Sequence, residues 1–202
     1  KESVLVSAFG HKARDIFKHI KQVQIVACGT SYNAGMVAKY WLEDISKIPC
    51  NVEVASEYRY RNPVILNDTL FIAISQSGET ADTLEALKVA KKINNTINTL
   101  CICNCAESSI TRISDLTFLT HAGPEIGVAS TKAFTTQLVA LALLTCSLGV
   151  IKKTISKKRE KSIVKSLKRL PGLINETLLE EDQIKKIAIS FKNKNSALFI
   201  GR

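Results

Sequence analysis

Short apolar runs alternate along the chain with longer segments in which apolar residues recur at helical spacing. The apolar runs cover residues 23–28, 50–55, 70–75, 99–104 and 115–120. Helical spacing extends over residues 31–47, 80–93 and 130–148, and the last of these segments is apolar nearly all round. Such alternation is typical of a parallel sheet with helices on both faces. We therefore expect an α/β protein with a three-layer α/β/α arrangement.

The length and composition fit a folded domain. With 202 residues and 46% hydrophobic composition, the chain can bury a substantial core as one domain, or as one domain and a fragment. We expect no apolar run to approach the roughly 20 residues that cross a bilayer, and the first residues lack the apolar block of a secretory signal. These features predict a cytoplasmic protein without a membrane partner. Because the chain lacks an initial methionine and stops at "ALFIGR", both ends are interpreted as cuts within a longer polypeptide.

The positive charge is concentrated in one segment. Residues 151–170 contain nine Lys or Arg residues and one Glu, a net +8 of the formal +10. A basic block can mark a nucleic-acid surface. Here, however, apolar residues recur beneath the lysines at helical spacing, and no aromatic residue is present to stack on bases. The segment is therefore interpreted as the solvated face of a helix, without a nucleic-acid partner.

The six cysteines do not have the spacing of a metal site. Three are isolated and three alternate along "LCICNCA", whereas zinc sites favour pairs separated by two residues. We expect no metal and no disulfide. The cysteines in the strand-like run are expected to be small buried residues of a core.

Three polar clusters follow strands and open helices: residues 28–31, 75–80 and 125–131. Since parallel strands end at one edge of a sheet, the clusters should lie together. Helix N-termini attract anions through free N–H groups and the helix dipole, and Ser or Thr hydroxyls add donors. The alternative is that Ser77 or Thr80 simply caps a helix. Three converging loops favour a phosphate-sized anion site.

The sequence contains neither a dinucleotide fingerprint nor a nucleotide-binding loop. A nucleotide is therefore disfavoured, and the small polar side chains suit the hydroxyls of a compact sugar. Lys132 could form a Schiff base with a ketose, and Glu79 or Glu125 could transfer a proton. Because each fits a helix or loop start, we assign none of them a catalytic role, and we assign none to the three histidines.

The segments "ACGTSYNAG", "ASEYRYR", "SQSGETADTLEAL" and "GPEIGVASTKAFTTQ" closely resemble the first sugar isomerase (SIS) domain of the glutamine:fructose-6-phosphate aminotransferase family. The resemblance extends from about residue 10 to the end of the chain. It implies a flavodoxin-like sheet in the order 2-1-3-4-5 and an enzyme that needs no metal or organic cofactor. It also implies phosphate-binding roles for Ser31, Ser75, Gln76, Ser77 and Thr80, and sugar-lining roles for Cys28, Gly29, Thr30, Val128 and Ser130.

The resemblance also implies a division of the chain. Residues 1–150 would form the SIS domain, residues 151–196 a helical connector, and residues 197–202 the start of a second SIS domain. The family's glutaminase domain and catalytic groups would lie outside this chain, and its isomerase halves pair as a homodimer. The chain alone is therefore expected to bind fructose 6-phosphate or glucosamine 6-phosphate without turnover. Two alternatives remain open: a phosphosugar-sensing domain of a transcriptional regulator, and a keto-aldo isomerase that uses no ammonia.

Overall fold

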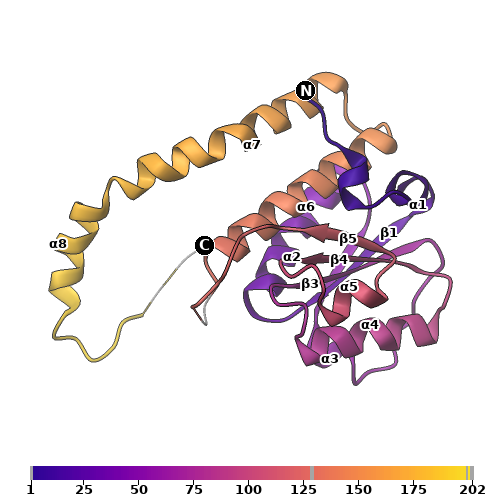
Figure 1. Ribbon diagram of the computed structural model, residues 1–202, viewed down its shortest axis with the longest axis horizontal. Coiled ribbons are helices and arrows are strands. Elements are labelled where there is room, and N and C mark those ends of the chain that lie inside the picture. The colour runs from indigo at the N-terminus through magenta and orange to yellow at the C-terminus, as the bar shows by residue number, and fades with distance from the viewer. Residues whose placement is uncertain (1, 128–129, 199, 201–202) are drawn as a thin grey trace.

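Five parallel strands form one sheet in the order β2-β1-β3-β4-β5 (Figure 1). The computed structural model describes residues 2–127, 130–198 and 200. The strands are β1 (Gln22–Ala27), β2 (Cys50–Val54), β3 (Thr69–Ser75), β4 (Asn98–Cys103) and β5 (Leu116–Leu119). Each lies within one residue of its predicted position. The predicted parallel sheet and its strand order are confirmed.

Helices cover both faces of the sheet, which gives the expected three layers (Figure 1). One face carries η1 (Val6–Phe9), α1 (Ala13–His19), α2 (Gly29–Trp41), which continues into the π-helical turn η2 (Leu42–Ser46), and α6 (Lys132–Ile151). The other face carries α3 (Ala55–Tyr58), α4 (Ala81–Ile93) and α5 (Ser109–Ile113).

The central strand β3 explains why the sheet is buried on both sides. All seven of its residues are buried. Leu70, Ile72 and Ile74 point into the core beneath α2 and α6, whereas Phe71 and Ala73 point into the core beneath α3 and α4. Successive side chains of a strand alternate between faces, so a continuous apolar run is required when helices cover both.

Helix α6 corrects one expectation from the sequence. An 18-residue stretch of this 20-residue helix has a mean hydropathy of 1.9, so by length and composition it could cross a membrane. The helix packs against α2 and α1, however, and half of its apolar window is buried inside the domain. Its apolar character therefore reflects its place in the larger core, which contains Ala140, Leu141, Leu144 and Leu148.

Two further helices, α7 (Lys157–Leu178) and α8 (Glu181–Phe191), form an arm that extends away from the sheet (Figure 1). The helix predicted for the basic segment, residues 151–170, only partly coincides with α7, which begins at Lys157 and ends at Leu178. Lys153 adopts a φ of 60° in a turn, and the helix begins after Ser156, whose side chain accepts a hydrogen bond from the Arg159 N–H. The helix then continues through Pro171.

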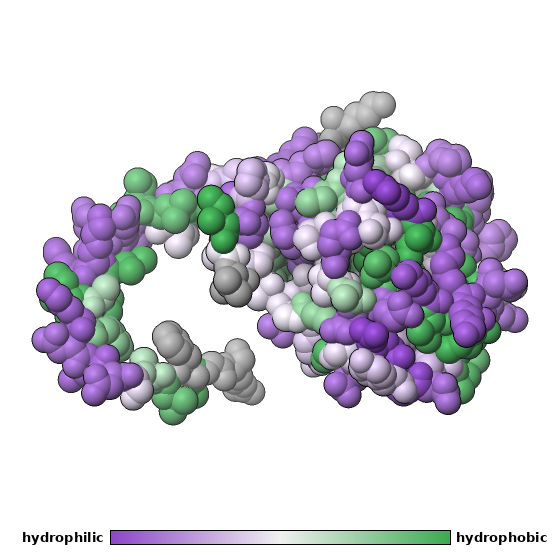
Figure 2. All heavy atoms as spheres, turned by 60° about the horizontal axis from the view of Figure 1, so that its bottom comes forward, coloured by the Kyte–Doolittle hydropathy of each residue, from purple (hydrophilic) through white to green (hydrophobic). Residues whose placement is uncertain are grey.

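Only the first turns of α7 are attached to the domain. Val164 and Glu160 are buried, and the Glu160 carboxylate accepts a hydrogen bond of 2.9 Å from the Val4 N–H. Beyond Leu170 the described side chains are exposed, including apolar ones, and green hydrophobic residues lie among purple hydrophilic ones along the arm in Figure 2. The interpretation of residues 151–196 as a connector, with a second domain starting at 197, remains a prediction.

Candidate functional site

The three polar loops converge at the carboxyl edge of the sheet. They form a pocket of about 370 Å³, to which the loop after β1, the loop after β3 and the loop before α6 all contribute. Strands β1 and β3 are neighbours, with Ala27 opposite Ile74, so their loops leave the sheet at the same level. From this pair the strand order continues to β2 on one side and to β4 and β5 on the other. Ligands of open α/β sheets bind at the point where the strand order reverses in this way.

The loop after β3 is braced from below by Ser75. Its buried hydroxyl accepts a hydrogen bond of 3.0 Å from the Gly78 N–H and shares another of 3.0 Å with the Thr80 hydroxyl. Gly78 adopts a φ of 68°, a conformation that glycine tolerates best. These bonds fold the loop over the end of the strand and turn the Ser77 and Thr80 side chains toward one pocket.

The capping alternative does not describe this loop. Thr80 is the N-cap residue of α4, yet its side chain makes no capping hydrogen bond. The Ser77 hydroxyl accepts a hydrogen bond of 3.2 Å from the Glu79 N–H, which lies before the helix. Cys28, the N-cap residue of α2, likewise makes no side-chain cap bond. The N-termini of α2 and α4 therefore face the pocket without an internal cap.

Glu79 points away from the pocket and fixes the neighbouring loop instead. Its carboxylate accepts a hydrogen bond of 2.7 Å from the Ser109 N–H, which holds the pKa of Glu79 below its ordinary value.

Asn104 provides a second link between the loops at this edge of the sheet. Its side chain accepts from the Ala122 N–H at 2.7 Å and donates to the Gly123 carbonyl at 2.8 Å, while its own N–H donates to the Gln76 carbonyl. Asn104 thus ties the loops after β3 and β5 together.

Most of the predicted site residues do meet in the pocket. Eight of them line it: Cys28, Gly29, Thr30, Ser31, Gln76, Ser77, Thr80 and Ser130. Ser75 lies beneath the pocket rather than in its lining, and Val128 lies outside the described residues. The lining also contains Glu125 and Gly127, which belong to the predicted polar cluster 125–131 but received no binding role from the sequence.

The carboxylate of Glu125 accepts hydrogen bonds at the N-terminus of α6, the third of the helices that begin at the pocket. Its Oε2 atom accepts hydrogen bonds from the Ala133 N–H at 3.1 Å, the Thr131 N–H at 3.2 Å and the Ser130 hydroxyl at 3.4 Å. The first of these bonds is the main reason why the pKa of Glu125 lies below its ordinary value. Local capping rules place the capping side chain at the helix start or three residues into it, so an acid six residues before Thr131 gave no signal in the sequence.

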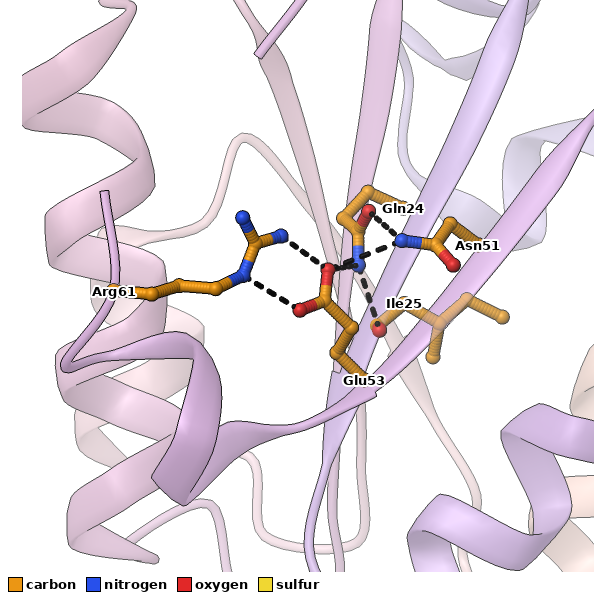
Figure 3. Close-up of polar contacts among 5 residues, drawn as sticks. All are labelled: Gln24, Ile25, Asn51, Glu53 and Arg61. Carbon is orange, nitrogen blue, oxygen red and sulfur yellow. Dashed lines mark hydrogen bonds and ion pairs between the residues drawn. The ribbon is translucent and has the colours of Figure 1, made fainter. Parts of the chain in front are cut away.

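A second pocket, of about 420 Å³, lies near the opposite ends of β1 and β2. Two of its polar lining residues, Gln24 and Asn51, belong to a hydrogen-bonded network with Glu53 and Arg61 (Figure 3). Arg61 donates to both oxygens of Glu53 at 2.8 and 2.6 Å, and the Gln24 and Asn51 amides donate to Glu53 at 3.2 and 3.1 Å. This network fastens the loop after α3 to the sheet. The side-chain amides of Gln24 and Asn51 are therefore paired within the protein.

The chain is similar to known proteins over its whole length. The chain is 57% identical over its full length to glutamine–fructose-6-phosphate aminotransferase of Pseudomonas putida, of which it spans 33%. The C-terminal domain of the corresponding Francisella tularensis enzyme has a similar structure, with a TM-score of 0.94 and 46% identity over all of this chain and 56% of that one. A glucosamine-6-phosphate deaminase from Thermotoga maritima is more distant, with a TM-score of 0.61 and 27% identity over 75% of this chain and 48% of that one.

The chain thus spans about one third of the length of the aminotransferase that it resembles over its entire sequence. Residues 16–147, which contain the sheet and all three pocket loops, match the SIS domain family. The fold and these matches together show that the chain belongs to the SIS domain family and corresponds to the SIS region of glutamine–fructose-6-phosphate aminotransferases.

Proposed function

We propose that this chain is the phosphosugar-binding part of the isomerase half of a glucosamine-6-phosphate synthase. The complete enzyme would convert fructose 6-phosphate and ammonia derived from glutamine into glucosamine 6-phosphate, for amino-sugar biosynthesis in the cytoplasm. It would do so as a homodimer whose glutaminase domain and second SIS domain lie outside this chain. The similarity to the aminotransferases over the whole chain supports this reading.

The observation that carries the proposal is the pair of uncapped helix N-termini at the pocket. The positive ends of the α2 and α4 dipoles and their free N–H groups suit a phosphate group. Ser31, Gln76, Ser77 and Thr80 add neutral donors around the same space. We propose that these four residues bind the phosphate, and that Cys28, Gly29, Thr30, Val128 and Ser130 surround the sugar. Ser75 supports the phosphate loop from beneath.

We further propose that this chain alone binds the sugar phosphate but does not convert it. Ring opening and proton transfer between carbons need a general acid and a general base near the sugar. Among the described lining residues there is no histidine or lysine, and the carboxylate of Glu125 is engaged by α6. Measurable glucosamine 6-phosphate from purified chain, fructose 6-phosphate and ammonium would contradict this part of the proposal.

Calorimetry with fructose 6-phosphate tests the binding site. Ser77→Ala should weaken binding about tenfold or more, because a hydrogen bond to a charged group contributes roughly 1.5 to 3 kcal/mol. Its melting temperature should stay close to that of the unaltered chain, since Ser77 makes no helix cap. Thr177→Ala, which removes an exposed hydroxyl on the arm, is the control and should leave affinity unchanged. Unchanged affinity of Ser77→Ala would refute the phosphate site.

A further inference from the structure

The three helix N-termini at the pocket are not equivalent. Those of α2 and α4 have no side-chain cap, whereas the N-terminus of α6 already holds the carboxylate of Glu125. The N–H groups of Thr131 and Ala133, which would otherwise be available to an anion, donate to Glu125 Oε2. Only two of the three N-termini therefore remain available for a phosphate.

Glu125 also determines the charge of the pocket. It is the only charged residue among the described lining residues, and the other lining groups are neutral. Hydrogen bonds from Ala133 and Thr131 and the nearby charge of Lys132 lower the pKa of Glu125, so the carboxylate is ionised at neutral pH. The pocket thus presents neutral donors at the α2 and α4 side and a fixed negative charge at the α6 side.

A sugar phosphate would meet these two sides with its two ends. If the phosphate lies against α2 and α4, as in the proposed function, the remainder of the sugar lies among the other lining residues, which include Glu125, Gly127 and Ser130 on the α6 side. The three hydrogen bonds that Glu125 accepts from Ser130, Thr131 and Ala133 all go to its Oε2 atom. A second anionic group at the same place would meet a like charge and helix N–H groups that are already bonded.

We propose that Glu125 is a specificity residue, which restricts the pocket to sugars that carry one phosphate and an uncharged distal end. This inference rests on the proposed function, because it requires a phosphate at α2 and α4. The ligand class is an open or cyclic hexose 6-phosphate whose distal groups are hydroxyl or carbonyl. Sugar bisphosphates and phosphorylated sugar acids are rejected by charge repulsion at the α6 side.

The test compares fructose 6-phosphate with fructose 1,6-bisphosphate and 6-phosphogluconate by calorimetry. The unaltered chain should bind fructose 6-phosphate at least tenfold more tightly than either of the others. Glu125→Gln has nearly the same size and keeps a side-chain oxygen for the helix, but it removes the charge. It should reduce the preference to about threefold or less. Because size is conserved, a reduced preference reports charge rather than steric exclusion.

Glu79→Gln is the matched control, since Glu79 is a carboxylate on a neighbouring pocket loop that bonds Ser109 and does not line the pocket. It should retain the full preference. If Glu125→Gln does not fold, a salt titration of the unaltered chain decides the question, because screening must narrow a preference that arises from charge.

Equal binding of the three ligands by the unaltered chain would overturn the role of Glu125 and leave the proposed function standing. A preference that persists undiminished in folded Glu125→Gln, or at high salt, would overturn it too. Failure of fructose 6-phosphate itself to bind would instead refute the phosphosugar pocket and, with it, this inference.

Discussion

Replacing Gly78 by alanine should destabilise the protein for two separable reasons. Gly78 has a φ of +68°, so any side chain there is strained. A Cβ atom would also lie 2.1 Å from Ser108 Oγ, 2.5 Å from Ser108 Cβ and 2.7 Å from Cys103 Sγ. Both neighbours are buried, at 4% and 0% exposure, so neither can move aside into solvent. The loop after β3 must therefore shift.

The expected cost follows from these two contributions. A non-glycine residue in the left-handed region costs roughly 1 to 2 kcal/mol, and overpacking of a filled interior costs roughly 1 to 3 kcal/mol. Alanine returns roughly 0.4 to 1 kcal/mol by restricting the unfolded chain. The free energy of unfolding should thus fall by about 3 kcal/mol. With a urea dependence of about 2 kcal/mol per molar, the unfolding midpoint should fall by about 1.5 M.

Gly123→Ala separates strain from steric clash. Gly123 has a similar φ of +74°, but nothing lies within 4 Å of its added Cβ. This variant should lose only about 1 kcal/mol, from backbone strain alone. Urea unfolding followed by the fluorescence of Trp41, the one tryptophan of the chain, measures both variants. If Gly78→Ala and Gly123→Ala differed by less than about 0.5 kcal/mol, the reasoning from packing would be wrong.

Three other outcomes are expected. Ser75→Ala should lower the free energy of unfolding, measured in urea, by about 1 to 3 kcal/mol, because the buried Gly78 N–H loses its acceptor. An unchanged free energy of unfolding would show that this hydrogen bond does not stabilise the loop after β3. Burial alone raises the pKa of Asp115, but hydrogen bonds from the Thr99 hydroxyl and N–H and from the Lys91 ammonium outweigh it and leave the pKa below its ordinary value. Its contribution should therefore be complete above about pH 4 and be lost as the pH falls through the folded-state pKa, and Asp115→Asn should lack this acid dependence in urea titrations. An aromatic disulfide reagent at pH 8 should modify exposed Cys105 in the folded protein and spare Cys50, whose pKa burial and the charge of Glu43 raise to about 12; comparable labelling in peptide mapping would contradict this.

Much of the fold could be predicted from local patterns. The strand positions followed from apolar runs, because a strand covered on both faces must be apolar at every position, as all seven residues of β3 are. The convergence of the three loops followed from parallel topology alone. Eight of the ten predicted site residues line one pocket for this reason.

The helices were predicted less completely. The helices α3 and α5 have only four and five residues. A helical period of apolar residues cannot be recognised over so short a segment, so the sequence did not reveal these helices. Helix α7 begins after a turn at Lys153 and the Ser156 cap, and it continues through Pro171, although proline usually ends or kinks a helix.

Strand and helix periodicity along the chain fixes where each loop begins, and therefore which residue types gather at the edge of the sheet. The role of each side chain there depends on long-range packing. Ser75 supports the loop after β3 from beneath because the sheet buries it, and Glu125 accepts a hydrogen bond from the N–H of Thr131, six residues later. Such contacts depend on how loops pack against one another, and local sequence patterns do not encode that packing.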